Sequence, residues 1–382
     1  MQIQEIPFNK VTALSSRDLA YQEGNKSLEP FISYPFEFDS LDRAIADRKN
    51  HTVDRNLLVS ELQNQYKSIP HSELVAEHIE MLAEDSTFSV ITAHQPSLLT
   101  GPLYYILKIC SAINLAKRAS SKSHKIVPVF IIGGEDHDFD EINHTYLFGK
   151  KISWDREASG SVGRLDLKGF DEIIEQVGAM LGKGEPADDL RKKLAFAQKN
   201  AKTYGEFSFL FTHAIFDAYG LVIANFDNKT FKKSFAPIIK KEIFEEFSKP
   251  LVVETQALLK EKGFSNQAYA RDINFFYLHD GQRLRIEKIK DTYHLIDSET
   301  TFTKSELEAI IDEFPERFSP NVVMRPIYQE HIMPNLAYIG GGGELAYWME
   351  RKTQFEAFGV FFPMLIRRTS AMWLSQKNQE VL

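Results

Sequence analysis

The sequence contains a single cysteine, Cys110, among its 382 residues. One thiol cannot form an internal disulfide framework or a zinc site built from several cysteines. The sequence also has no run of about eighteen apolar residues, the length needed to span a membrane. Its start, MQIQEIPFNK, lacks the charged and apolar regions of a secretory signal. We therefore expect a cytoplasmic protein that does not associate with membranes.

The sequence also has no excess of positive charge. Lys and Arg total 45 against 53 Asp and Glu, which gives a net charge of −8 and a pI near 5.8. Binding to nucleic acid needs clustered Lys and Arg that neutralise phosphates, so this balance argues against a nucleic-acid partner. The hydrophobic content of 43% is ordinary for a globular protein. The length allows one main domain with a second unit or insertions.

A strand, loop, helix, strand pattern occupies residues 86–149. The apolar runs at 88–93 and 126–132 are typical of buried parallel strands. Between them we expect a helix that begins at Gly101 and Pro102, with Thr100 as its N-cap. The free N–H groups of such a helix start favour an anion. Because ligands of open parallel α/β sheets bind beyond the carboxyl ends of the strands, this stretch predicts an α/β fold and the place of the active site.

The helix after Pro102 is predicted to have two faces. Tyr104 and Lys108, four residues apart, share one face that could point along the crevice. Cys110 lies on the other face, so we interpret it as a packed thiol rather than a nucleophile. The predicted apolar stripe consists of Leu103, Ile106, Leu107, Cys110 and Ile113.

A dense polar cluster, EDHDFDEINH, follows the second apolar run. Three Asp, two Glu and two His fall within these ten residues. If the segment is helical, Asp136, Asp140 and His144 lie on one side. Such a group could bind a divalent cation, act as a general base or hold substrate amines and hydroxyls. The alternative is an acid-rich helix start that the helix dipole favours without any function. We expect function, with Asp136, His137, Asp138, Asp140 and His144 as catalytic candidates.

The remaining sequence predicts insertions into the core. A long amphipathic helical pattern runs from Lys229 to about Gly263, and the Asp-Gly pair at 280–281 predicts a β-hairpin. Arg283 and Arg285 alternate along that hairpin, and we expect both to face solvent. The predicted units are an N-terminal wrap at 1–85, a first core half at 86–149, a helical insertion at 150–205, a core strand with helices at 206–263, a small β-rich insertion at 264–318 and a second core half at 319–382.

The second core half holds a glycine loop and a basic strand end. Glycines let a backbone approach a ligand closely and leave amides free for it, although the loop matches neither the dinucleotide fingerprint nor the phosphate-loop motif. Glu344 then opens a helix, where its charge is favourable in any case. The last apolar run, VFFPMLI, ends in arginines and hydroxyls suited to anionic groups. The candidate anion-binding residues are Gly340, Gly341, Gly342, Gly343, Arg367, Arg368, Ser370 and, from the first helix, Lys108.

Three blocks of sequence resemble one known family. They are AHQPSLLTGPLYYILK, PVFIIGGEDHDFDEINH and RPIYQEHIMPNLAYIGGGGELAYWMERKTQFEAFGVFFPMLIRR. In order and spacing they resemble the bacillithiol biosynthesis cysteine-adding enzymes over about residues 85–375. The resemblance implies a Rossmann-like core related to class I aminoacyl-tRNA synthetases, two connecting insertions and a C-terminal coiled coil used for dimerisation. The first block departs from the family in having His94 where we expect an amide, and the sequence stops at Leu382, where the coiled coil would begin, which leaves a homodimer open.

The implied reaction joins the carboxyl of L-cysteine to the amine of glucosaminyl-malate, the last step of bacillithiol biosynthesis. Making an amide from a free carboxylate requires activation, and the implied fold suggests an ATP-derived adenylate, with magnesium as a possible companion of ATP. The candidate anion-binding residues would stabilise phosphate charge, and the catalytic candidates would bind the sugar, take the amine proton or hold magnesium. The candidate substrate-binding residues are His94, Gln95, Thr100, Gly101, Tyr104, Asn143, Tyr328, Gln329 and Tyr338.

Two other functions stay open at this point. A metal-dependent hydrolase would use the Asp and His cluster as cation ligands at about 2.0 to 2.2 Å. A non-enzymatic scaffold would show a large exposed apolar patch and no enclosed pocket. The ligase interpretation requires the polar segments near residues 100, 140, 340 and 368 to meet around one cavity, at the same edge of a parallel sheet.

Overall fold

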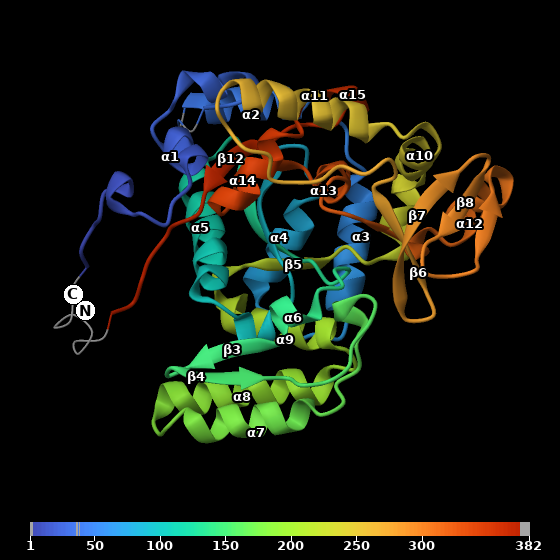
Figure 1. Cartoon of the computed structure of the whole chain (residues 1–382). Helices are drawn as coiled ribbons and strands as arrows, with labels where there is room; N and C mark the ends of the chain where they lie inside the picture. The colour runs from blue at the N-terminus through green and yellow to red at the C-terminus, as the bar shows by residue number, and fades with distance from the viewer. Residues whose placement is uncertain (1–2, 36, 38, 375–382) are drawn as a thin grey trace.

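A five-stranded parallel sheet forms the centre of the molecule in the computed structural model, which describes residues 3–35, 37 and 39–374 (Figure 1). The strand order is β12-β11-β1-β2-β5, and every neighbouring pair is parallel. The predicted α/β class is therefore confirmed, with a Rossmann-like sheet. The strands are β1 (Thr87–His94), β2 (Lys125–Ile132), β5 (Val222–Asn225), β11 (Asn335–Gly340) and β12 (Met364–Arg367).

Apolar side chains cover both faces of this sheet, because neighbouring residues of a strand point to opposite sides. On one face Phe88 and Val90 of β1 pack with Ala112 and Ala116 of helix α5. Ile91 of β1 belongs to the larger cluster on the other face. The helices outside the insertions are α1 (Ser16–Gln22), α2 (Asp39–Arg48), α3 (Arg55–Tyr66), α4 (Glu73–Met81), α5 (Leu103–Ala119), α9 (Tyr204–Phe216), α10 (Lys229–Glu245), α11 (Ser248–Glu261), α13 (Arg325–Ile332), α14 (Gly342–Met349) and α15 (Lys352–Phe358).

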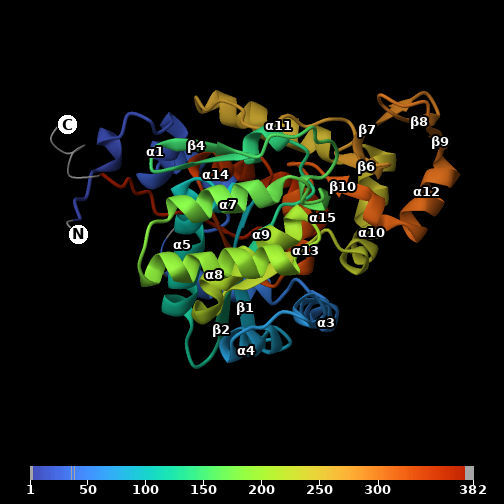
Figure 2. The ribbon, with the colours of Figure 1, turned by 90° about the horizontal axis from the view of Figure 1, so that it is seen from below.

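Two groups of elements project from the core. One lies at the bottom of Figure 1, and Figure 2 shows its helices α7 and α8 side by side. It contains α6 (Phe139–Ile142), β3 (His144–Leu147), β4 (Lys150–Ser153), α7 (Phe170–Met180) and α8 (Glu185–Asn200). The other is an antiparallel sheet of order β10-β6-β7-β8-β9 on the right of Figure 1. It contains β6 (Phe275–His279), β7 (Gln282–Ile289), β8 (Thr292–Leu295), β9 (Thr301–Thr303), α12 (Lys304–Glu313) and β10 (Phe318–Pro320).

The hairpin predicted at 280–281 is confirmed. Asp280 and Gly281 join β6 to β7 with φ angles of 46° and 74°. A two-residue turn of this kind needs positive φ at both positions, which Asp-Gly adopts at low cost. The exact limits of the predicted domains stay predictions. In the described part of the chain, no helix combines the length and the apolar character needed to cross a bilayer.

Three local predictions are wrong. The long helix from 229 to 263 is two helices, because Glu246 adopts a left-handed φ of 52° and ends α10. Helix α5 begins at Leu103, with Pro102 rather than Thr100 at the N-cap, since Thr100 has a φ of 72°. The predicted stripe of α5 is also displaced, because Leu103 is 48% exposed. The side chains that face the sheet are Tyr105, Lys108, Ile109, Ala112, Ala116 and Ala119.

A buried carboxyl in α13 makes folding stability depend on pH. Glu330 accepts hydrogen bonds from Asn335 and Gln329 on Oε1, whereas its buried Oε2 has no partner in the described part of the chain. Burial raises the pKa of Glu330 from 4.5 to about 7. Between these two values the folded protein keeps a proton that the unfolded chain loses, so stability falls as pH rises through this window.

We therefore expect E330Q to flatten the pH dependence of unfolding. The loss of stability between pH 5 and pH 8 should shrink by on the order of 2 kcal/mol, measured by urea denaturation. The control is E172Q, which changes an exposed glutamate of α7 and should leave the wild-type slope intact. An E330Q slope equal to that of wild type would show that Glu330 does not titrate in this way.

Candidate active site at the carboxyl ends of the strands

Polar residues follow β1, β2, β11 and β12 at one edge of the parallel sheet. Contacts join these strand ends in two pairs: Gln95 after β1 bonds Asp136 after β2, and Arg368 after β12 donates its backbone N–H to Gly340 O of β11. The parallel pairing of β1 with β11 places the two pairs side by side. The segments near 100, 140, 340 and 368 therefore lie at one rim. A cavity of about 340 Å³ is lined by other residues, between 156–166 and the β6–β7 turn at 278–282.

An ion pair between a buried lysine and a partly exposed glutamate lies at the centre of this rim. Lys108 of α5, only 1% exposed, donates to Glu344 of α14 at 2.8 Å and to the backbone oxygen of Ala93 in β1. Glu344 also accepts from Tyr338 Oη and from Gly341 N, both at 2.8 Å. Burial alone would raise the pKa of Glu344, but the charge of Lys108 and these hydrogen bonds lower it. The predicted anion-binding Lys108 is therefore already neutralised by a carboxylate.

His94 lies beside this pair, between Tyr104 and Tyr105, with both ring centroids 5.4 Å away. Its Nδ1 lies 3.0 Å from Gln95 O. Burial and the charge of Lys108 lower the pKa of His94 to about 4. His94 is thus a neutral imidazole at neutral pH.

Arg325 is a site residue that the sequence interpretation missed. It begins α13 and donates to Tyr347 Oη at 2.7 Å. Burial alone would lower the pKa of Arg325, but Tyr347, Tyr338 and Glu344 raise it, so the guanidinium stays charged. Arg325 begins the third block of family resemblance, but no local pattern marks it as a site residue, and its position next to Glu344 in space reveals it.

Asp136 is the best-defined carboxylate of the acid cluster. Its Oδ2 accepts from Gln95 Nε2 at 2.5 Å, and its Oδ1 accepts from His137 N at 2.7 Å. Arg283 Nη1 lies 4.0 Å from Oδ1. Burial alone would raise the pKa of Asp136, but hydrogen bonds from Gln95 and from the backbone N–H of His137, together with the charge of Arg283, lower it below its usual range. Asp136 is therefore a fixed anion at the rim.

Arg283 corrects a prediction of solvent exposure. Its side chain is only 6% exposed, and it packs over the Phe276 ring at 3.9 Å. Arg283 projects from β7 of the β-rich insertion and contacts His137 in the turn after β2. Alternation of Arg with apolar residues along a strand shows which face the arginine shares, but it does not show what covers that face.

The turn that carries Asp136 is held in place from two sides. Val162 N donates to Asp136 O at 2.7 Å, and Gly163 N donates to Gly134 O at 2.8 Å. A Cβ at Gly163 would lie 2.8 Å from Gly134 Cα, so this close approach requires glycine. Lys232 of α10, 1% exposed, pairs with Glu135 next to Asp136. The turn therefore has little freedom.

Apart from His137, the other predicted catalytic residues of the acid cluster do not join Asp136. The predicted helix is a single turn, α6, so the expected polar face does not form. Asp138 caps α6 by accepting from Glu141 N at 3.1 Å, and Asp140 is exposed. His144 begins β3 and lies 3.0 Å from Asn143 Oδ1. Within residues 3–35, 37 and 39–374, no three His, Cys, Asp or Glu side chains are placed to hold a metal ion.

The glycine loop meets an acid of the chain itself. Asp18 of α1 binds Arg367 through both carboxylate oxygens, at 2.7 and 2.9 Å, and both side chains are only 5% exposed. A Cβ at Gly342 would lie 2.5 Å from Asp18 Oδ2, so the carboxylate fills the start of α14. Gly343 is exposed, and Arg367 also donates to Ser370 Oγ at 2.7 Å. Arg367 and this loop are therefore not open to a phosphate.

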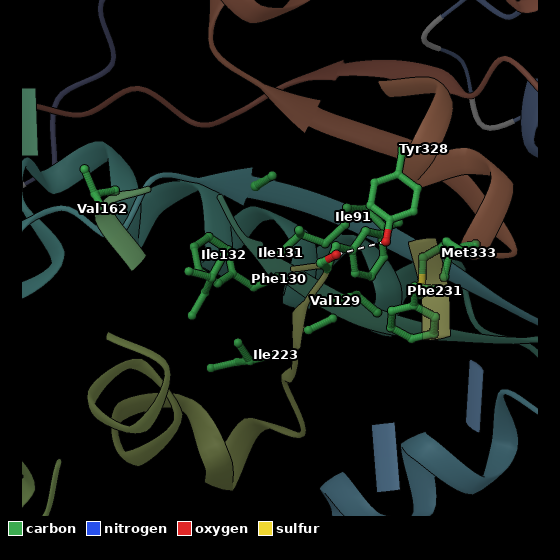
Figure 3. Packing of buried hydrophobic residues seen from close by; sticks show 14 of the residues in the cluster. Ile91, Val129, Phe130, Ile131, Ile132, Val162, Ile223, Phe231, Tyr328 and Met333 are labelled. Carbon is green, nitrogen blue, oxygen red and sulfur yellow. Dashed lines mark hydrogen bonds between the residues drawn. The ribbon is translucent and has the colours of Figure 1, made fainter. Parts of the chain in front are cut away.

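Two candidate substrate-binding residues, Tyr328 and Gln329, belong to the core. Figure 3 shows Tyr328 among buried apolar side chains, and its hydroxyl donates to Phe226 O at 2.9 Å. Gln329 is 1% exposed and donates to Glu330 Oε1. Both side chains are therefore buried and not open to a substrate. The sequence pattern around them did not predict this burial.

Arg368 is the basic residue of the last strand that remains at the rim. Its guanidinium lies 5.0 Å from the Tyr104 ring centroid, and it donates to Thr369 O at 3.0 Å and to Ser370 Oγ at 3.2 Å. Tyr104 is 38% exposed at the start of α5. The preceding turn is tight, because a Cβ at Gly101 would lie 2.6 Å from Ser97 Cβ. Thr100, Gly101, Tyr104 and Arg368 thus form the accessible edge.

The chain is thus an α/β protein with a Rossmann-like sheet and a charged rim at the carboxyl edge, the edge at which open α/β sheets hold their ligands. Residues 1–369 match the family described as "Bacillithiol biosynthesis BshC, N-terminal Rossmann-like domain". The chain therefore belongs to this family of cysteine ligases of bacillithiol biosynthesis, and the predicted resemblance is confirmed.

Three similar proteins carry the name "Putative cysteine ligase BshC". The protein of Christiangramia forsetii is 39% identical over 371 residues, which cover 95% of this chain and 69% of the relative. That of Flavobacterium johnsoniae is 37% identical, covering 94% and 68%. That of Cytophaga hutchinsonii is 35% identical, covering 96% and 69%.

Removing the carboxylate of Asp18 should destabilise the fold. D18A would leave Arg367 buried without its anionic partner, which costs about 3 kcal/mol, as for other broken buried pairs. Chemical denaturation measures the loss. The matched control is D188A, which removes a 63% exposed partner from Arg191 and should stay close to wild type. Equal unfolding midpoints for D18A and wild type would mean that the Asp18–Arg367 pair contributes nothing.

The structure also separates Asp136 from Asp140, which the sequence placed on one face. We expect D136N to lower the rate of cysteine coupling by about 100-fold or more, because a preorganised charge at the rim is lost. D140N should stay within about twofold of wild type, since its side chain points to solvent. Steady-state rates of both purified variants test this. Similar losses in the two would show that the cluster acts as one unit.

Proposed function

We propose that the chain forms the amide bond between the carboxyl of L-cysteine and the amine of glucosaminyl-malate, with ATP activating the carboxyl. Membership of the cysteine ligase family supports the reaction class. The observation that carries the proposal is the arrangement of charge at the rim. Asp136 is a fixed anion on one side, and Arg368 and Arg325 are cations on the other. Such an arrangement suits substrates that carry an amine at one end and carboxylates at the other.

Asp136 is suited to bind the amine rather than to deprotonate it. A carboxylate with a strongly lowered pKa is a weak base at neutral pH but a good hydrogen-bond acceptor. It can orient the amine toward the carboxyl carbon, and the amine's proton then leaves to solvent or to a second group. His94, with its pKa lowered to about 4 by burial, has a free lone pair at neutral pH but limited basicity.

Arg368 and Arg325 are suited to the anionic parts of the substrates. The malate group carries two carboxylates, and guanidinium groups bind carboxylates and phosphates through paired N–H donors. ATP, when bound, supplies the leaving group for amide formation. The fit to its phosphates is limited to Arg368 and the turn at 100–104, because Lys108 and Arg367 are neutralised by Glu344 and Asp18. The hydrolase alternative finds no cation ligand set among the described residues.

A direct assay tests this proposal. Purified protein with glucosaminyl-malate, cysteine and ATP should give the coupled thiol by mass spectrometry, with AMP rather than ADP as the nucleotide product. R368M should raise the KM for glucosaminyl-malate by about tenfold, whereas its KM for cysteine should change less. Formation of the thiol without nucleotide turnover would remove ATP from the proposal. If no thiol forms, and the protein instead hydrolyses an amide substrate supplied in a separate assay, the hydrolase alternative would be favoured.

A further inference from the structure

Arg283 of the β-rich insertion makes a contact that determines the chemistry of His137. Its Nη1 lies 3.0 Å from His137 Nδ1. A guanidinium has only N–H donors and no acceptor, so a hydrogen bond at this distance requires a lone pair on Nδ1. In a neutral imidazole, the ring proton must then be on Nε2.

Asp136 competes for the same nitrogen. Its Oδ1 lies 3.3 Å from His137 Nδ1, a distance at which an Nδ1–H could donate to the carboxylate. That tautomer would leave the Nε2 lone pair free, as in an Asp–His pair that acts as a general base. That tautomer would also place the Nδ1 proton against an N–H of Arg283, so that two hydrogen-bond donors would face each other. The two neighbours therefore demand opposite tautomers.

Arg283 is the less mobile of the two neighbours. Its Nε donates to Ser319 Oγ at 3.1 Å, its Nη2 donates to Pro320 O at 3.2 Å, and Phe276 packs against its plane. Asp136 Oδ1 already accepts the backbone N–H of His137 at 2.7 Å and does not need the ring proton. The charged groups around the ring are thus Asp136 from the core and Arg283 from β7, with the Phe276 ring of β6 at 5.8 Å.

We propose that Arg283 is a positioning residue: its hydrogen bond to Nδ1 holds His137 as the Nε2–H tautomer and makes it a hydrogen-bond donor rather than a general base. The His137 side chain is 53% exposed, so Nε2, across the ring from Nδ1, is open to a ligand at the rim. On the proposed function, from which this last step follows, the Nε2–H stabilises negative charge on the oxygen of the reacting carboxyl. A residue of the β-rich insertion thereby determines which nitrogen of His137 carries the proton.

Nitrogen NMR of the full chain labelled with ¹⁵N-histidine tests the tautomer without any substrate. Long-range ¹⁵N–¹H spectra distinguish the Nδ1–H ring, the Nε2–H ring and the doubly protonated ring, and H137Q identifies the His137 signals by their loss. We expect the Nε2–H form in wild type at neutral pH. An Nδ1–H ring or a doubly protonated ring would overturn the proposal.

Variants of Arg283 separate this role from a purely structural one. R283M removes the donor and should move the proton to Nδ1, toward Asp136, whereas R283K keeps a cation without an acceptor and should preserve Nε2–H. R285M removes the other arginine of this strand, which pairs with Glu287, and it should leave the His137 signals unchanged. If R283M does not fold, the wild-type and R283K spectra still decide the tautomer. A folded R283M with the wild-type tautomer would refute the proposal.

The coupling assay then measures the consequence. R283M should lower kcat by about tenfold or more, as the loss of one positioned donor does, and R283K should recover part of it. An unchanged kcat in R283M would refute the catalytic part of the proposal. If wild type shows no coupling at all, the proposed function fails while the tautomer result still stands or falls on the spectra.

Discussion

The ion pair of Lys108 and Glu344 is the interaction on which the centre of the rim depends. A buried ammonium is tolerated only with close pairing and further hydrogen bonds, and Glu344 and Ala93 O supply them to Lys108. Tyr338 Oη and Gly341 N in turn hold Glu344. The pair thereby joins α5 to α14 and both helices to the ends of β1 and β11, and it fixes where these helix starts lie relative to the strand ends.

Internal pairing also decides which charges remain for a substrate. Lys108 and Arg367 look like anion-binding residues in the sequence, but Glu344 and Asp18 neutralise them inside the protein. What is left at the rim is an anion fixed by Gln95 and the cations Arg368 and Arg325. The acceptors and donors are therefore few, and each is held by its neighbours. This agrees with an active site whose charges are preorganised before substrates bind.

The sequence was sufficient for the sheet, the Asp280–Gly281 hairpin and the edge at which the site lies, because these depend on strand period, turn chemistry and the common direction of parallel strands. It was insufficient for partners far apart in the chain. Asp18 lies 349 residues from Arg367, and Arg283 lies 146 residues from His137. No local pattern reveals such pairs. The predicted polar face of the acid cluster was wrong for another reason. It assumed helical periodicity in a segment in which only one turn, α6, is helical.

A crystal structure of the chain with glucosaminyl-malate bound tests directly whether substrates bind at the rim beside Asp136 and Arg368. We expect the amine within hydrogen-bond distance of Asp136 and a malate carboxylate on Arg368. Density for the ligand only in the cavity of about 340 Å³ between residues 156–166 and 278–282 would contradict it.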